Sequence, residues 1–310
     1  MTSRFLPEGR LLYTPGNTAA CATAEGLARA QALGSILEGT ALLCDENHDL
    51  LVRLGPFTGR IPRTETALGI AEGSTRDIAI LSRVGKPVSF TVERLDNKDG
   101  VLCPLLSRRH AQAMALEEIL SWPPGKVIPA TVTHLEPFGA FVDIGCGIPS
   151  MIGVDRLSVS RISQPSDRLR VGDEIRAAVL SVDRTLERVT LTHRELLGTW
   201  EENAALFRAG MTVPGHVRGI KEYGTFVELT PNLSGLAECR EGVREGDRVS
   251  VYVKSILPRR MKLKLLIIDI LPPEERPEPP RYFITDGVLD RWNYAPEGCW
   301  KSGGETVFSK

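Results

Sequence analysis

Two aromatic pairs are the side chains of this sequence best suited to bind another molecule. Phe138 and Phe141 stand three positions apart in the run FGAF, and Tyr223 and Phe226 do so in the run YGTF. A regular strand would turn rings at this spacing to opposite faces, but the glycine after the first ring permits a bulge that brings both to one face. Such a pair either packs in a core or forms a platform for flat ligands, above all unpaired nucleobases, and the spacing alone leaves both open.

The two pairs belong to a longer internal repeat. Residues 125–144, GKVIPATVTHLEPFGAFVDI, recur as residues 210–229, GMTVPGHVRGIKEYGTFVEL, so the chain contains one module at least twice. Each copy predicts a hairpin, a short third strand, a polar loop with a Gly-Asp pair, a long alternating strand and a closing strand. Five short strands in roughly 70 residues match the OB barrel, whose exposed face and loops bind oligonucleotides.

The residues of the first copy resemble the S1 RNA-binding domain family of the small-subunit ribosomal protein. The similarity rests on FGAFVDIG, on the Gly-Asp pair before the fourth strand and on VDRTLERVTLT after it. The resemblance implies an RNA-binding OB barrel in which Phe138 and Phe141 stack on bases, with Asp183 and Arg188 at the binding edge. The corresponding residues of the second copy are Tyr223, Phe226 and Lys262. Its basic turn adds Arg259 and Arg260 to the expected RNA-binding residues.

Both copies depart from the family pattern at the third strand. The usual histidine is Gly153 in the first copy and Glu238 in the second, and the second copy has Leu257 where the family has an acid. These departures leave the stacking platform intact. They argue against tight or sequence-selective binding.

We expect a mainly β chain of tandem five-stranded OB barrels joined by short helices. An earlier stretch parallels the repeat, but His48 and Leu51 fall where the stacking rings should be, which favours a protein contact or a structural role for this barrel. The aromatic C-terminal arm either packs on a barrel or docks on a partner. The expected segments are an N-terminal arm and helix (1–33), a diverged S1-like barrel (34–107), a linker helix (108–124), an S1 barrel (125–194), a second linker helix (195–209), another S1 barrel (210–270) and a Pro-rich linker with the aromatic arm (271–310).

The charge balance is unusual for a nucleic-acid binder, because such proteins commonly carry a basic excess. The net charge is -1 and the pI is near 6.6. The three barrel segments differ, however: 34–107 has 8 basic against 10 acidic residues, 125–194 has 9 against 8, and 210–268 has 10 against 6. Phosphate contacts are therefore expected mainly from the last module.

Little in the sequence indicates catalysis, a metal or a membrane. The six cysteines are far apart and form no C-x-x-C pair, which predicts reduced, buried thiols and no metal site. No nucleotide-binding glycine loop, zinc-protease motif or nucleophile elbow is present, so neither a cofactor nor enzymatic activity is expected. The first residues lack a signal pattern, and no apolar run reaches the roughly 18 residues of a membrane helix, which predicts a cytoplasmic protein.

These observations favour a non-catalytic RNA-binding protein that captures single-stranded mRNA or rRNA in translation, with the small ribosomal subunit as a candidate partner. Two alternatives remain at this stage. One is an accessory RNA-binding protein of RNA decay or transcription, since the same domain type occurs there. The other is a protein-interaction scaffold whose barrels no longer bind RNA.

Overall fold

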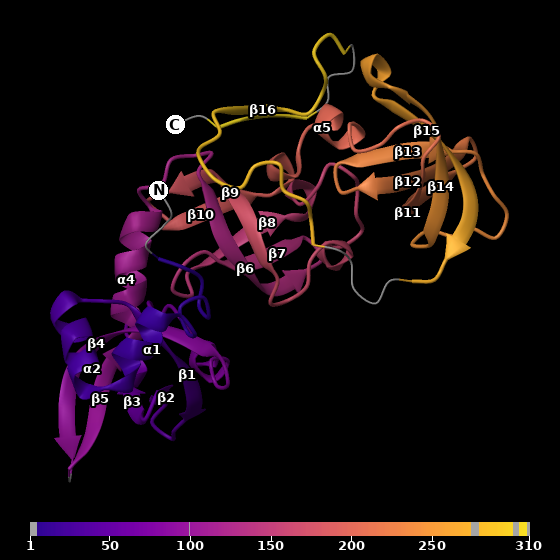
Figure 1. The fold of residues 1–310 in the computed structure, drawn as a ribbon. Coiled ribbons are helices and arrows are strands. Elements are labelled where there is room, and N and C mark those ends of the chain that lie inside the picture. The colour runs from indigo at the N-terminus through magenta and orange to yellow at the C-terminus, as the bar shows by residue number, and fades with distance from the viewer. Residues whose placement is uncertain (1–4, 99, 274–278, 300–303, 309–310) are drawn as a thin grey trace.

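The chain folds into three closed five-stranded β-barrels that follow one another along an elongated molecule (Figure 1). This computed structural model describes residues 5–98, 100–273, 279–299 and 304–308. The first barrel lies at one end, and helix α4 leads from it to the second barrel (Figure 1). The expected fold class, tandem five-stranded barrels joined by short helices, is confirmed.

The N-terminal segment contains two helices where one was predicted. Pro15–Asn17, which has the composition of a turn, begins helix α1, because Thr14 accepts a hydrogen bond from the Asn17 N–H and proline is tolerated in the first turn. Helix α2 is the helix expected within residues 1–33; it is capped by Thr23 and ends at Gly34. The elements up to the end of the first barrel are α1 (Pro15–Ala22), α2 (Ala24–Leu33), β1 (Leu37–Cys44), β2 (Leu50–Leu54), β3 (Phe57–Ile61), the 3-10 turn η1 (Arg63–Glu65), α3 (Ile78–Leu81), β4 (Pro87–Lys98) and β5 (Val101–Ser107).

The second and third barrels repeat this strand plan, and a helix precedes each of them. The second barrel and its linker helix comprise α4 (Arg108–Ile119), β6 (Val127–Glu136), β7 (Gly139–Asp143), β8 (Pro149–Gly153), η2 (Val154–Arg156), η3 (Pro165–Asp167), β9 (Glu174–Asp183) and β10 (Arg188–Thr192). The third comprises η4 (Arg194–Leu197), α5 (Trp200–Ala204), β11 (Thr212–Lys221), β12 (Gly224–Thr230), β13 (Leu233–Ala237), β14 (Arg248–Leu257), η5 (Pro258–Arg260) and β15 (Lys262–Leu271).

Strand register relates the three barrels position by position. The first strand of each barrel carries a bulge at the same place, and the residue just beyond it pairs with the second strand. These pairs are Leu43 with Leu51, His134 with Phe141, and Gly219 with Phe226. Leu51 of the first barrel therefore occupies the position of Phe141 in the second, which confirms the alignment that the sequence suggested.

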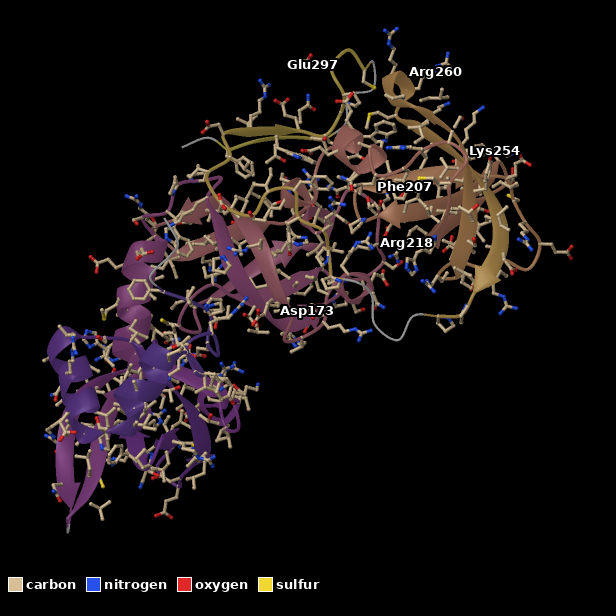
Figure 2. All side chains as sticks on the ribbon, in the orientation of Figure 1. Asp173, Phe207, Arg218, Lys254, Arg260 and Glu297 are labelled. Carbon is tan, nitrogen blue, oxygen red and sulfur yellow. The ribbon has the colours of Figure 1, made fainter. Side chains whose placement is uncertain are left out.

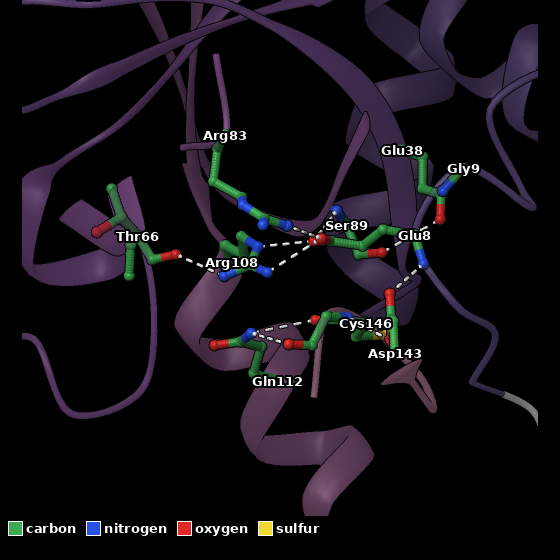
Figure 3. A network of polar contacts seen from close by, with 12 residues as sticks. Glu8, Gly9, Glu38, Thr66, Arg83, Ser89, Arg108, Gln112, Asp143 and Cys146 are labelled. Atoms are coloured by element: carbon green, nitrogen blue, oxygen red, sulfur yellow. Dashed lines mark hydrogen bonds and ion pairs between the residues drawn. The ribbon is translucent and has the colours of Figure 1, made fainter. Parts of the chain in front are cut away.

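A buried ionic cluster joins the first barrel to the second (Figure 3). Glu8, from the N-terminal segment, receives hydrogen bonds from Arg108 at 2.6 Å and from Arg83 at 3.2 Å. The backbone N–H of Glu8 donates to Asp143 of β7 at 2.7 Å. Burial alone would raise the pKa of Glu8, but the two guanidinium groups outweigh it and the pKa is lowered. Glu8 thus links the first barrel, the second barrel and helix α4.

A second buried ion pair joins the second barrel to the third. Arg168, in the loop between β8 and β9, donates to the Glu228 carboxylate at 2.7 Å, and both side chains are more than nine-tenths buried. Arg218 of the third barrel pairs with the same carboxylate at 3.0 Å. Asn232 adds a hydrogen bond from the Val159 N–H at 2.9 Å. The two barrels therefore form one packed unit.

The C-terminal segment lies back across this unit (Figure 1). The Leu289 N–H donates to the Gly125 carbonyl at 2.9 Å, and Trp292 and Tyr294 belong to a buried apolar cluster that includes residues of both the second and the third barrel. Two short strands close the segment, β16 (Arg291–Asn293) and β17 (Glu305–Val307). The predicted packing of this aromatic arm on a barrel is confirmed for its described part. Residues 274–278 of the expected Pro-rich linker and Trp300 of the arm lie outside the described residues.

Candidate nucleic-acid interface

The aromatic pair of the second barrel lies on the outer face of the barrel. Phe138, in the turn before β7, is 57% exposed, while Phe141 on β7 is half-buried. Their ring centroids are 6.1 Å apart, with the ring planes at 85°. A methyl group on Gly139 would meet the Ile152 carbonyl oxygen at 2.5 Å, so β8 leaves room only for glycine between the rings. The exposed ring is available to a ligand.

The third barrel repeats the arrangement. Tyr223 is 71% exposed, Phe226 is half-buried, and their ring centroids are also 6.1 Å apart, at 88°. A methyl group on Gly224 would approach the Ala237 carbonyl oxygen at 2.7 Å. The same backbone constraint therefore fixes both platforms. The cores lie elsewhere, among residues such as Ile128 and Val251, so the exposed rings are not needed to fill them.

Strand pairing extends each platform across the neighbouring strands. Phe141 pairs with Met151 of β8, which in turn pairs with Thr190 of β10. The equivalent row of the third barrel is Phe226, Leu236 and Lys264. No motif of the sequence marks Met151, Leu236 or Thr190 as part of the site. The barrel register would have indicated them, since they stand opposite the aromatic position.

The predicted edge residues lie at matching ends of the fourth and fifth strands. Arg188 pairs in register with Asp183, and Lys262 pairs with Leu257. Arg188 and Lys262 are exposed. Asp183 accepts hydrogen bonds at 2.9 Å from two backbone N–H groups of the following turn, those of residues 185 and 186. Its carboxylate thus orders the turn that carries Arg188.

The basic turn of the third barrel adds further cations. Arg259 and Arg260 lie on η5, where both are exposed, and Figure 2 shows Arg260 and Lys254 on the barrel farthest from the first. Lys254 is held by Glu238 at 2.9 Å. The hydrogen bond and charge of Lys254 lower the pKa of Glu238. Glu238, at the position of the family histidine, therefore offsets part of the positive charge.

Each platform borders a groove. The groove of the second barrel has a volume of about 940 Å³ and contains Phe141, Met151 and Arg188. That of the third has a volume of about 490 Å³ and contains Tyr223 and Phe226. In each barrel the structure therefore brings a predicted ring and a predicted cation, Arg188 or Lys262, into one concave surface.

The first barrel has a different face at the equivalent place. Leu51 replaces the half-buried ring and pairs with Arg60 of β3, whose guanidinium bonds to Asp49 at 2.9 Å. His48, at the position of the exposed ring, has a positive φ of 62°. This face offers no pair of stacking rings.

Two buried titratable side chains outside the platforms, Cys146 and His193, favour their neutral forms. Burial raises the pKa of Cys146 to about 12, which keeps its thiol protonated at neutral pH. Burial lowers the pKa of His193 to about 4, and this ring bonds to the Leu157 carbonyl at 2.9 Å and to the Tyr282 hydroxyl at 3.0 Å. All six cysteines are free, but the expectation that all are buried is wrong: Cys21 and Cys146 are buried, whereas Cys44, Cys103 and Cys299 are half-buried and Cys239 is exposed. Among the described residues, no group of three or more metal-ligand side chains gathers, and no helix is long and apolar enough to cross a membrane.

Comparison with known proteins identifies the second barrel. Residues 122–194 match the S1 RNA binding domain family. The small ribosomal subunit protein bS1 homolog of Bacillus subtilis is 33% identical over 212 residues, which cover 63% of this chain and 54% of the relative. The small ribosomal subunit protein bS1 of Leuconostoc lactis is 32% identical over 183 residues, which cover 55% and 42%. The resemblance inferred from the sequence is thus confirmed, and the chain spans about half the length of these relatives.

A solved structure adds only a weak likeness. A multidomain protein with nucleic acid binding domains from Streptococcus pneumoniae aligns with 76% of this chain and 73% of its own. The identity is 17% and the TM-score is 0.25, which is too low to support an argument.

Proposed function

We propose that this chain, whose second barrel is an S1 RNA-binding domain, is a non-catalytic RNA-binding protein that captures single-stranded RNA in translation. Its partners are mRNA or rRNA and, through them, the small ribosomal subunit. Its location is the cytoplasm, where ribosomes work. The similarity to bS1 proteins over more than half of the chain supports this assignment.

The observation that carries the proposal is the pair of equal platforms. Two barrels present an exposed ring and a half-buried ring at the same separation, 6.1 Å, each beside a groove. Every base has a flat face, so stacking on such rings tolerates any sequence. Two sites on one packed unit would also act together, because binding at the first raises the effective concentration of the strand at the second.

The proposed RNA-binding residues divide into rings and edge groups. The rings are Phe138, Phe141, Tyr223 and Phe226. Bases of an unpaired strand stack on these rings, while exposed guanidinium and ammonium groups neutralise the phosphates. Asp183 orients the turn that carries the first of these cations. The cations are Arg188, Arg259, Arg260 and Lys262.

One experiment distinguishes this proposal from two alternatives, a protein-binding scaffold and an accessory protein of RNA decay or transcription. The purified chain would be sedimented with small ribosomal subunits, with and without prior digestion of accessible RNA, beside a variant with all four rings replaced by alanine. The proposal expects the wild type to sediment with the subunits, and expects both digestion and ring removal to reduce this association. Association that survives both treatments would instead indicate a protein-binding scaffold. Failure to sediment, with RNA binding retained, would favour an accessory role in RNA decay or transcription.

A further inference from the structure

The groove over the second platform has one wall that comes from another barrel. One side is the face of the second barrel, with Phe141, Met151 and Arg188. The other side is residues 67–83 of the first barrel, the connection between β3 and β4 that contains α3, and Arg108, Gln112 and Leu116 of α4 continue it. In the third barrel, by contrast, the groove is lined by residues 223–265 of that barrel itself. The larger volume over the second platform, about 940 against 490 Å³, accompanies this added wall.

The wall is mostly small and uncharged. Its lining includes Leu68, Thr75, Ala79 and Ser82. Arg83 also lines the cavity, but its guanidinium is engaged by the Glu8 carboxylate at 3.2 Å. Such a surface can contact bases and sugars without attracting phosphates strongly.

The wall is held in place relative to the platform by one buried amide. The Gln112 oxygen accepts a hydrogen bond from the Leu68 N–H at 3.0 Å, and its nitrogen donates to the Cys146 carbonyl at 3.2 Å. Gln112 therefore ties the first barrel's connection to the second barrel. Arg108 adds a hydrogen bond to the Thr66 carbonyl at 3.1 Å. A groove with fixed sides requires little ordering when a ligand enters.

We propose that residues 67–83 of the first barrel form the second half of the RNA site of the second barrel, so that one unpaired strand lies between the two. This inference rests on the proposed function, because it takes Phe141 and Arg188 to be RNA contacts. The first barrel, which lacks a platform of its own, thus contributes to RNA binding through its connection. A strand between two walls has its bases enclosed, which an RNA duplex does not permit.

Ser82 offers the test, because its side chain is exposed and lines the groove. In the full chain, Ser82→Glu would repel the phosphates of a strand in the groove and Ser82→Lys would attract them. Val101 is the matched control: it lies at the start of β5 in the same barrel, is 63% exposed and stands outside the lining of the groove. The probe is a fluorescein-labelled 12-nucleotide oligouridine, measured by anisotropy at 0.15 M salt, where the screening length is about 8 Å.

The expected result is a loss of affinity of about fivefold for Ser82→Glu and a gain of similar size for Ser82→Lys. The same charges at Val101 should change affinity by less than about twofold, because this position is not part of the groove and salt screens charges between separate exposed sites. Opposite signs at one position cannot arise from unfolding, and melting temperatures would check the fold directly. Equal effects at Ser82 and Val101, or none at either, would overturn the inference.

A platform variant separates this inference from the proposed function. The double replacement of Phe138 and Phe141 by alanine removes the rings but leaves the wall intact. If it binds oligouridine less tightly while the Ser82 variants match their controls, the rings bind RNA and the contribution of residues 67–83 is refuted. If it binds as well as the wild type, the rings do not bind RNA, and both the proposed function of this face and the inference that rests on it are refuted.

Discussion

Removing one platform should weaken RNA binding without unfolding the barrel. Phe138 is 57% exposed, so its replacement by alanine should cost less than about 0.5 kcal/mol of stability. Phe141 is half-buried, which places its replacement below the roughly 3–5 kcal/mol of a fully buried phenylalanine. The fold should therefore survive the double change, and loss of binding can be read as loss of contact.

The size of that loss follows from stacking. Each base that stacks on an aromatic ring contributes about 1–3 kcal/mol, which corresponds to about 5-fold to 150-fold in affinity. The double variant should show a loss in this range, and replacing Tyr223 and Phe226 should give a comparable one, because both platforms share one geometry. Loss of both platforms should leave only weak, salt-sensitive binding.

Fluorescence anisotropy with labelled oligouridine measures these affinities, and circular dichroism with thermal melting checks the fold. The matched control is Tyr13→Ala, an 88% exposed ring of the N-terminal segment, which should bind as the wild type does. Unchanged affinity in the platform variants would refute the reasoning. So would unfolding of the barrel, which would show that these rings belong to the core.

Further predictions concern specificity, the joint between barrels and pH. Binding should favour single strands over duplex by at least about tenfold, and equal affinity for duplex RNA would contradict this. Four phosphate contacts, one for each proposed cation, would give a slope of about -3 for log K against log salt. Arg168→Ala should lower the free energy of unfolding by about 3 kcal/mol in urea titrations. This is the low end for a broken buried ion pair, because Arg218 still neutralises the Glu228 carboxylate. A change within about 0.5 kcal/mol would show that the pair contributes little to stability. Burial raises the pKa of Glu38 from its usual 4.5 to about 7. The protonated carboxyl therefore adds to the free energy of unfolding in full below pH 4.5, and this contribution is lost as the pH rises through about 7. The melting temperature of Glu38→Gln should therefore rise relative to wild type between pH 5 and pH 8, and a constant difference would rule this out.

The repeat made the fold predictable from sequence. The aromatic-Gly-x-Phe run recurs with the same downstream spacing, so strand plan and platform could be assigned together. Leu51 shows that even the diverged barrel could be aligned, since its backbone pairing is the same as that of Phe141. Local caps can be recognised in the same way: Thr199 and Glu202 have the spacing of a capping box, and they form one at the start of α5.

The contacts between barrels were not predictable in this way. Glu8 meets Arg108 across 100 positions, and no local pattern marks either residue as buried. The Pro15–Asn17 stretch has the composition of a turn, yet its cap begins helix α1. The groove over the second platform depends on Gln112, a polar residue that no motif of the sequence marks as buried. Sequence patterns report which face of an element is apolar, whereas partners distant in the chain are set by how whole barrels dock.

The structure also changes the RNA affinity expected of separate fragments of the chain. Because the first barrel lacks the ring pair and the basic excess lies in the last module, the sequence predicts that residues 125–271 keep most RNA affinity and that residues 1–122 bind poorly. The piece of residues 125–271, however, lacks the wall of residues 67–83 and the C-terminal segment that bonds to Gly125. We therefore expect it to bind less tightly than the full chain, and equal affinity of the two in one anisotropy titration would count against a contribution from the first barrel.

The most direct measurement of the central claim is where RNA touches the chain. Oligouridine containing 4-thiouridine would be photo-cross-linked to the intact protein at 0.15 M salt, and the modified peptides would be located by mass spectrometry. The account predicts cross-links within residues 138–141 and 223–226, competed away by unlabelled single strands. Cross-links confined to the first barrel, or to the basic turn at residues 258–260 with neither platform labelled, would contradict it.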